Sequence, residues 1–121
     1  MFLNEMERDI FSPEGGNSLE NKFFYCVTAT LPNLDAVKAY KGWLIPHISK
    51  VINAGALSGK IVELNGGPLR VESHYIFESR KDFENYEMNE APKLRQEGII
   101  FSEKYKGISY ERKSGEIIYS E

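Results

Sequence analysis

The chain has 121 residues, of which 27% are charged and 41% are apolar, a composition that predicts one globular domain. Its net charge of −3 disfavours a polyphosphate partner, so we expect no nucleic-acid binding. It contains no run of about 18 apolar residues, and its first ten residues are charged where a signal peptide is apolar. We therefore expect a cytoplasmic protein with no membrane partner. The single cysteine, Cys26, lies in an apolar run and is interpreted as a buried structural thiol.

Charge is unevenly distributed along the chain. Residues 1–21 carry five acids and one base, and they include the turn-forming residues Pro13, Gly15 and Gly16. Residues 22–121 carry thirteen acids and fourteen bases. The sequence therefore predicts an acidic N-terminal arm at 1–21, flexible or loosely docked, followed by one folded domain at 22–121.

The first half of that domain begins with a strand and a helix. Residues 23–31 are rich in aromatic and β-branched side chains, and both alternating faces are at least partly apolar, which is typical of a strand covered on both sides. Pro32 ends this strand. Asn33 is a suitable N-cap for the helix that follows, whose apolar positions recur at steps of three and four. Pro46 interrupts this pattern and predicts a kink or a split near Ile45.

The second half contains two further strands, a helix and a fourth strand. Residues 57–64 and 70–79 are predicted strands joined by a tight turn, since Asn-Gly-Gly-Pro at 65–68 supplies the positive φ angles that a hairpin needs. Ser79 or Asp82 caps a helix that Pro92 breaks and Gly98 ends. The remaining segment is expected to form a strand at 106–112, a turn at 113–115 and a short fifth strand at 117–119.

The element order β-α-β-β-α-β predicts an α+β ferredoxin-like sandwich, in which both helices cover one face of a four-stranded sheet. The other face is bare in a single copy. Phe23, Tyr25 or their neighbours would then lie in water, and the sheet of a second copy is the expected cover. The pattern therefore predicts a homodimer.

One segment of the first helix resembles the dimeric α+β barrel proteins. It runs from Trp43 through His47 to Val51 and is followed by Gly55. In those proteins a tryptophan precedes a helical turn that contains a histidine, and a glycine leads into the second strand. The resemblance implies the same dimeric ferredoxin-like fold.

A second segment is more specific. Residues 86–98, which include Asn89-Glu90-Ala91-Pro92, resemble the second helix of an uncharacterised bacterial family in the same superfamily. Together the two segments extend the resemblance over residues 22–112. The superfamily includes small monooxygenases of the antibiotic-biosynthesis type, haem-degrading enzymes, lactone isomerases and stress-induced proteins. The resembled family has no assigned reaction, so the likeness implies a fold rather than a chemistry.

His47 is the candidate catalytic residue. It lies four residues after Trp43 and beside Pro46, where it would face a pocket between helix and sheet and act as an acid, a base or a haem ligand. The alternative is a hydrogen-bonded histidine that stabilises the helix kink. Trp43, Tyr75 and Arg95 complete the candidate ligand-binding set. For Arg95 the alternatives are a cation favoured by the end of a helix and a bidentate partner for a ligand carboxylate.

His74 is interpreted as a partly exposed cross-strand partner. Two histidines 27 residues apart, without a cysteine cluster, are not a metal signature, so no metal and no cofactor is predicted. The first hypothesis for function is a homodimeric small-ligand-binding or scaffold module. The alternative is a small cofactor-independent monooxygenase or isomerase that acts on an aromatic or apolar molecule between sheet and helices. An open cavity shared by His47 and Arg95 would favour the enzyme.

Overall fold

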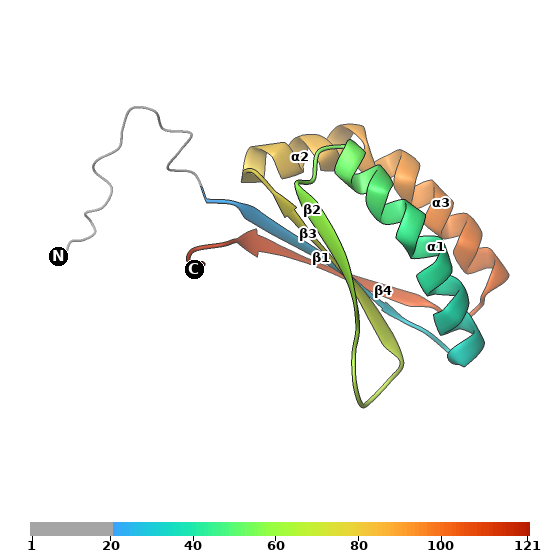
Figure 1. Cartoon of the computed structure of the whole chain (residues 1–121). Coiled ribbons are helices and arrows are strands. Elements are labelled where there is room, and N and C mark those ends of the chain that lie inside the picture. Colours follow the sequence, from blue (N-terminus) through green and yellow to red (C-terminus); the bar gives the residue numbers. More distant parts are fainter. Residues whose placement is uncertain (1–20) are drawn as a thin grey trace, which may run out of the picture.

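The computed structural model describes residues 21–121 as a two-layer α+β domain (Figure 1). The four strands form one antiparallel sheet in the order β2-β3-β1-β4, and the helices lie against one of its faces. This is the predicted ferredoxin-like arrangement. The proposed arm lies outside the described residues except for Asn21. The elements are β1 (Phe23–Thr30), α1 (Leu34–Asn53), β2 (Ser58–Glu63), β3 (Arg70–Phe77), α2 (Arg80–Asn89), α3 (Ala91–Lys104) and β4 (Ser109–Glu116).

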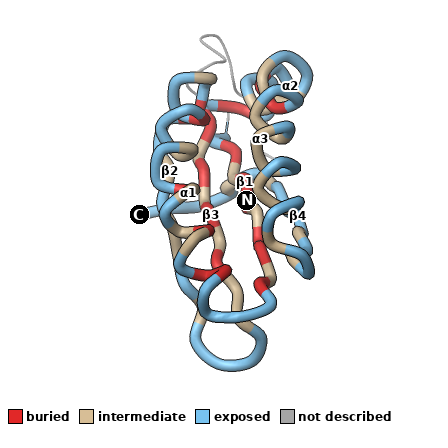
Figure 2. Tube along the Cα trace, turned by 90° about the vertical axis from the view of Figure 1, so that its right-hand side faces the viewer, coloured by how far each residue is buried: buried red, intermediate tan, exposed pale blue. Residues whose placement is uncertain are grey.

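The two central strands hold most of the core. Figure 2 shows the buried residues running along β1 and β3. On β1, Phe23, Tyr25 and Ala29 pack beneath the helices, while Cys26 and Thr28 on the opposite face are also buried. Both faces of this strand therefore contain buried side chains, but within residues 21–121 the helices cover one face only.

Helix α1 begins where the sequence predicts, but it is not split. The side chain of Asn33 accepts a hydrogen bond from the backbone N–H of Ala36 at 2.9 Å, which caps the first turn. Pro46 lies within a single uninterrupted helix. The carbonyl that loses its donor belongs to Gly42, four residues earlier, and both residues are exposed. Water can therefore solvate that carbonyl, and the helix continues past the proline.

The expected second helix is two helices, and the second is longer than predicted. Ser79 caps α2 by accepting from the N–H of Asp82 at 3.2 Å. Pro92, which was predicted to break the helix, lies in the first turn of the separate helix α3. Gly98 does not end the helix, because α3 continues to Lys104. Phe101, beyond the glycine, packs against the aromatic side chains of α1, so tertiary contacts carry the helix past this weak position.

Strand β4 replaces the predicted turn and fifth strand. Residues 113–115 pair with β1 as part of a continuous ladder from Thr30↔Ser109 to Phe23↔Glu116, and residues 117–119 belong to no strand. Lysine, serine and glycine have low strand propensity. They are extended here because β1 supplies a partner along its whole length.

The register of the sheet decides which face each side chain occupies. Phe23 and Tyr25 face the helices, so they are not the exposed aromatics of the bare face. Their neighbour Phe24 lies on that face, beside His74 of β3, with ring centroids 5.4 Å apart. None of the helices within residues 21–121 is long and apolar enough to cross a bilayer.

Candidate functional site

A cavity of about 530 Å³ lies between the sheet and the helices. Helix α1 forms one wall, α3 forms the opposite wall, and the helix-facing side chains of the sheet form the floor. All four predicted ligand-binding residues line it, namely Trp43, His47, Tyr75 and Arg95. They come from three different elements, and only the fold brings them together. Their role in binding a ligand remains a prediction.

Aromatic side chains line the cavity on the α1 wall and on the floor. Tyr40 and Trp43, one helical turn apart on α1, stack with ring centroids 5.7 Å apart. Phe101 of α3 contacts both rings. On the floor, Tyr25 and Tyr75 of neighbouring strands stack at 5.8 Å, as their direct cross-strand pairing dictates. Such walls favour a flat, unsaturated ligand.

Burial controls the charge of the tyrosines. It raises the pKa of Tyr75 to about 12, and it raises the pKa values of Tyr40 and Tyr86 further. All three side chains line the cavity and are neutral at physiological pH. Their hydroxyl groups can therefore donate hydrogen bonds to a ligand oxygen.

His47 lies in the α1 wall, where its ring stacks on Trp43. Burial lowers the pKa of its imidazole, the nearby carboxylate of Glu97 partly opposes this shift, and the ammonium group of Lys50 reinforces it. The ring is therefore neutral at pH 7 and has one nitrogen lone pair free to accept a proton.

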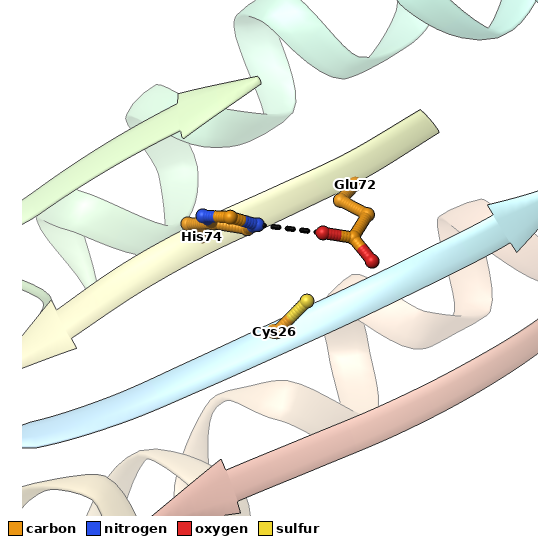
Figure 3. A group of neighbouring side chains, drawn as sticks. All are labelled: Cys26, Glu72 and His74. Atoms are coloured by element: carbon orange, nitrogen blue, oxygen red, sulfur yellow. Dashed lines mark hydrogen bonds and ion pairs between the residues drawn. The ribbon is translucent and has the colours of Figure 1, made fainter. Parts of the chain in front are cut away.

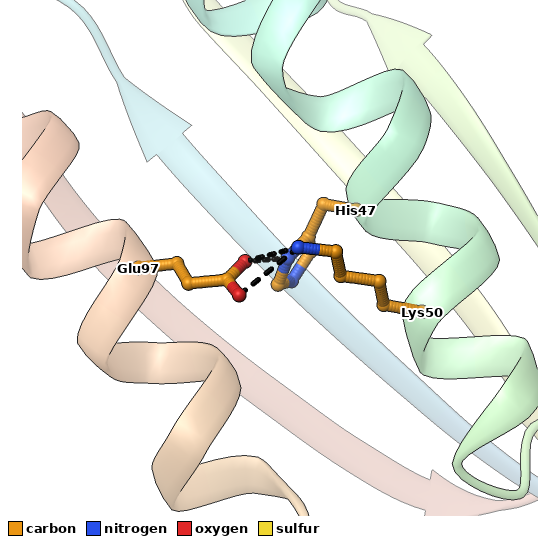
Figure 4. Close-up of polar contacts among 3 residues, drawn as sticks. All are labelled: His47, Lys50 and Glu97. Carbon is orange, nitrogen blue, oxygen red and sulfur yellow. Dashed lines mark hydrogen bonds and ion pairs between the residues drawn. The ribbon is translucent and has the colours of Figure 1, made fainter.

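The Nδ1 atom of His47 is buried and has no hydrogen-bond partner within residues 21–121. Glu97 of α3 is its nearest carboxylate, at 4.0 Å, which is too far for a hydrogen bond. Lys50 holds that carboxylate through two contacts of 3.0 Å from its Nζ atom (Figure 4). The structure thus offers no support at Nδ1 for the alternative of a hydrogen-bonded structural histidine.

Arg95 occupies a different helical position from the one predicted. It lies in the first half of α3 rather than in the last turn of a helix, so the favourable helix-end charge does not apply. Its Nη2 atom donates to both carboxylate oxygens of Glu87 on α2, at 2.6 and 2.8 Å. This ion pair joins α2 to α3 and positions the guanidinium group in the cavity wall.

Sequence reasoning missed the contribution of β4 to the cavity. Tyr110 and Arg112 alternate onto its helix-facing side and line the cavity together with Lys106 from the preceding loop. The hydroxyl groups of Tyr110 and Ser102 lie 2.8 Å apart. Both residues lie in the strand predicted at 106–112, where their spacing of two places them on one face, but the sequence did not indicate that this face is the one beneath the helices.

The two histidines do not meet. His74 lies on the opposite face of the sheet from the cavity, where it is directly opposite Cys26 on β1. It is partly exposed, as predicted for a cross-strand partner, and its Nε2 atom lies 2.8 Å from a carboxylate oxygen of Glu72.

No family model matches the chain, and no curated protein sequence matches it significantly. Among solved structures, it is similar to a dimeric ferredoxin-like protein from an uncultured marine organism, with a TM-score of 0.69 and 15% identity, over 84% of this chain and 99% of the other. The chain has an α+β ferredoxin-like fold. The predicted resemblance is thereby confirmed at the level of the fold.

Two further solved structures share this ferredoxin-like fold. SnoaB, a cofactor-independent oxygenase from Streptomyces nogalater, matches with a TM-score of 0.62 and 5% identity, over 83% of this chain and 96% of the other. A de novo designed protein matches with a TM-score of 0.52 and 8% identity, over 78% and 96%. One ferredoxin-like fold therefore accommodates an enzyme and a designed chain, so function has to be argued from the cavity.

Proposed function

We propose that this ferredoxin-like protein binds a flat aromatic small molecule in the cavity between its sheet and its helices. The observation that carries the proposal is the cavity itself, about 530 Å³ in volume, with His47 and Arg95 both in its wall. Small-molecule sites in proteins typically enclose about 300–1,000 Å³ and combine apolar walls with a few polar groups. A scaffold without a ligand would have no need of such a space.

The polar groups indicate which aromatic molecules fit. Neutral tyrosine hydroxyls and the cationic side chains of Arg112 and Lys106 line the cavity. These groups stabilise an oxygen that carries negative charge, such as a phenolate or a carboxylate. The expected ligand is therefore a hydroxylated or acidic aromatic compound of two or three rings.

Trp43 provides the test, because it is the single tryptophan of the chain and lines the cavity. We expect hydroxylated naphthalenes and anthracenes to quench its fluorescence in a saturable way and to raise the melting temperature. Saturated alcohols with the same number of carbon atoms serve as controls and should do neither. A panel in which no aromatic compound changes either signal would contradict the proposal.

A second candidate function is cofactor-independent oxygenation, favoured by the neutral His47 in the cavity wall, whose Nδ1 atom has no hydrogen-bond partner among the described residues. The imidazole would take the hydroxyl proton of a bound phenol, and the phenolate would then reduce dioxygen. One oxygen atom enters the substrate as a quinone carbonyl, and the other leaves as water. The phenol supplies all four electrons, so no external reductant is required. The similarity to SnoaB supports this chemistry for the fold.

Oxygen uptake distinguishes the two candidates. Compounds that quench Trp43 are incubated aerobically with the full chain, and oxygen consumption and quinone absorbance are followed. An enzyme should lose at least about a hundredfold in turnover on His47→Gln while retaining ligand quenching, since general-base catalysis contributes roughly 10²–10⁴-fold. Binding without oxygen uptake would leave the ligand-binding module as the function.

We also propose that two copies associate through the outer faces of their sheets. Phe24 and Ile76 contribute apolar surface there, and no helix of the described chain covers it. The structural neighbour from the marine organism is described as dimeric. Light scattering should give twice the chain mass of 13.8 kDa at micromolar concentration. A particle of 13.8 kDa would contradict the dimer.

A further inference from the structure

We propose that the outer face of the sheet holds a zinc-type metal site formed by Cys26, Glu72 and His74. One ligand atom from each residue, the Sγ, a carboxylate oxygen and an imidazole nitrogen, lies within 4.8 Å of the other two (Figure 3). The site lies on the face opposite the cavity, so it is independent of the proposed ligand binding.

The strand register builds the cluster. Cys26 on β1 lies directly opposite His74 on β3, and Thr28 lies directly opposite Glu72. Side chains two residues apart on a strand project from the same face. The four side chains therefore form a compact square on two neighbouring strands at the centre of the sheet. The sequence conceals this arrangement, because Cys26 lies 46 residues before Glu72 and 48 before His74.

The donor atoms of these three side chains indicate which metal the site would bind. A thiolate, an imidazole and a carboxylate are the three donors that zinc uses in proteins, whereas calcium and magnesium prefer oxygen donors alone. Around a tetrahedral zinc ion, neighbouring ligand atoms lie about 3.4–3.6 Å apart, given bonds of about 2.0–2.3 Å. The atoms of Glu72 and His74 are now 2.8 Å apart. The widest separation in the cluster, at most 4.8 Å, exceeds this tetrahedral spacing by about 1 Å, a difference that side-chain rotation can supply.

A second hydrogen bond already orients the carboxylate. The hydroxyl group of Thr28 donates to Oε2 of Glu72 at 2.9 Å, while Oε1 faces His74. Thr28 and Cys26 are only 6% and 2% exposed, so neither can turn away into solvent. In metal sites, a hydrogen-bonded neighbour typically fixes the orientation of a side chain that binds the metal. On binding, the thiol proton of Cys26 would pass to solvent, and His74 would offer the lone pair of Nε2 as the neutral tautomer with its proton on Nδ1.

Two features define how the site should behave. Three protein ligands leave a fourth coordination position on the outer side, available to water or to a group from a facing molecule. Lys113 on β4 pairs with Cys26 from the other side and brings a positive charge close to the thiol. That charge opposes a cation, so its removal should strengthen metal binding.

Cobalt(II) is the probe, because it occupies zinc sites and reports its ligands by absorption. The full chain is stripped with a chelator, dialysed and titrated with cobalt(II). We expect one ion per protomer, a near-ultraviolet thiolate-to-cobalt band, visible bands of tetrahedral intensity, and loss of all of them when zinc is added. A chain that develops no thiolate-to-cobalt band would overturn the proposal without recourse to any variant.

Variants then assign the ligands. Cys26→Ser should abolish the thiolate band, and His74→Gln should weaken cobalt binding by more than the roughly 10–100-fold that loss of an outer partner costs. Lys113→Met should tighten binding, a gain that a damaged fold would not produce. His47→Gln, which removes the other histidine of the chain, should leave the titration unchanged. Unaltered binding by Cys26→Ser or by His74→Gln, or lost binding by His47→Gln, would overturn the assignment.

Discussion

The imidazole of His47 stacks on the indole of Trp43, with ring centroids 4.5 Å apart and an angle of 22° between the rings. The indole also contacts Phe101 of α3, so the stack joins the two helices that form the cavity walls. The covered imidazole is largely removed from water, which lowers its pKa. The same contact therefore positions the candidate base and keeps it neutral.

This burial predicts a pH dependence of stability. The pKa of His47 is lowered below its ordinary value of 6.5 in the folded chain and returns to that value on unfolding. As the pH falls below about 6.5, the unfolded chain binds a proton before the folded chain does. The contribution of neutral His47 to the free energy of unfolding is thus fully present above about pH 6.5. It is lost as the pH falls from there through the pKa of His47 in the folded chain.

Urea unfolding at about pH 7.5 and about pH 5.5 measures this dependence. The free energy of unfolding should fall more for the wild type than for His47→Gln over that range. The comparison stays above pH 5 so that Glu72 does not contribute to the difference. Its hydrogen bond with His74 lowers the pKa of the Glu72 carboxyl, and the stability that this ionised carboxylate adds is lost only below about pH 4.5. Equal losses for both chains would contradict the assignment to His47.

Gly98 allows the cavity to be filled without touching a polar group. It lies in the interior of α3, lines the cavity, and a Cβ atom placed on it would lie 3.8 Å from the Trp43 ring, an ordinary contact. Gly98→Leu should therefore project its side chain into the space that a ligand would occupy. We expect Trp43 quenching by aromatic compounds to weaken at least about tenfold.

Gly98→Ala is the matched control for that experiment. Its single methyl group fits, and alanine is favoured over glycine inside a helix by about 0.5–1 kcal/mol. This variant should melt at a slightly higher temperature and keep its ligand affinity. If both variants bind as the wild type does, the ligand lies elsewhere.

Gly59 on β2 is required by the close approach of α1. A Cβ atom at this position would lie 2.9 Å from the Cγ2 atom of Ile48 and 3.2 Å from the ring of Tyr75. Gly59→Ala should therefore destabilise the fold by about 1–3 kcal/mol, as overpacked core positions do. Gly42→Ala is its control, since nothing lies within 4 Å of that site and the helix gains a better former. Chemical denaturation of both variants should give shifts of opposite sign.

A single charged substitution tests whether the outer face of the sheet forms the interface between two copies. Phe24→Glu places a carboxylate at the proposed interface between two copies, where an unpaired buried charge costs several kcal/mol. We expect light scattering to show the monomer mass while circular dichroism stays unchanged. Met88→Glu introduces the same charge on α2 at a residue that is 75% exposed, and this variant should remain a dimer. Equal masses for the two variants would exclude this face as the interface.

The features that could be predicted from the sequence by itself depend on interactions between residues close together in the chain. The strand at 23–30, the caps at Asn33 and Ser79, and the hairpin glycines Gly66 and Gly67, both with positive φ, follow from side chains acting on their own backbone. The order of these elements then restricts the topology to the ferredoxin-like fold. His47 and Trp43 were proposed as site residues because they stood beside a helix signal, whereas Arg95 was proposed at a helix end and lies instead in the first half of α3.

Only the tertiary structure decided how these elements meet. Helix α3 passes Gly98 because Phe101 finds aromatic partners on α1, and β4 includes residues 113–115 because β1 provides hydrogen bonds along its length. The faces of β1 were also undecided, since both are apolar and a register shift of one residue exchanges them. The cavity and the proposed metal site depend on that register, because it places Tyr25 beneath the helices and Cys26 beside His74 on the outer face.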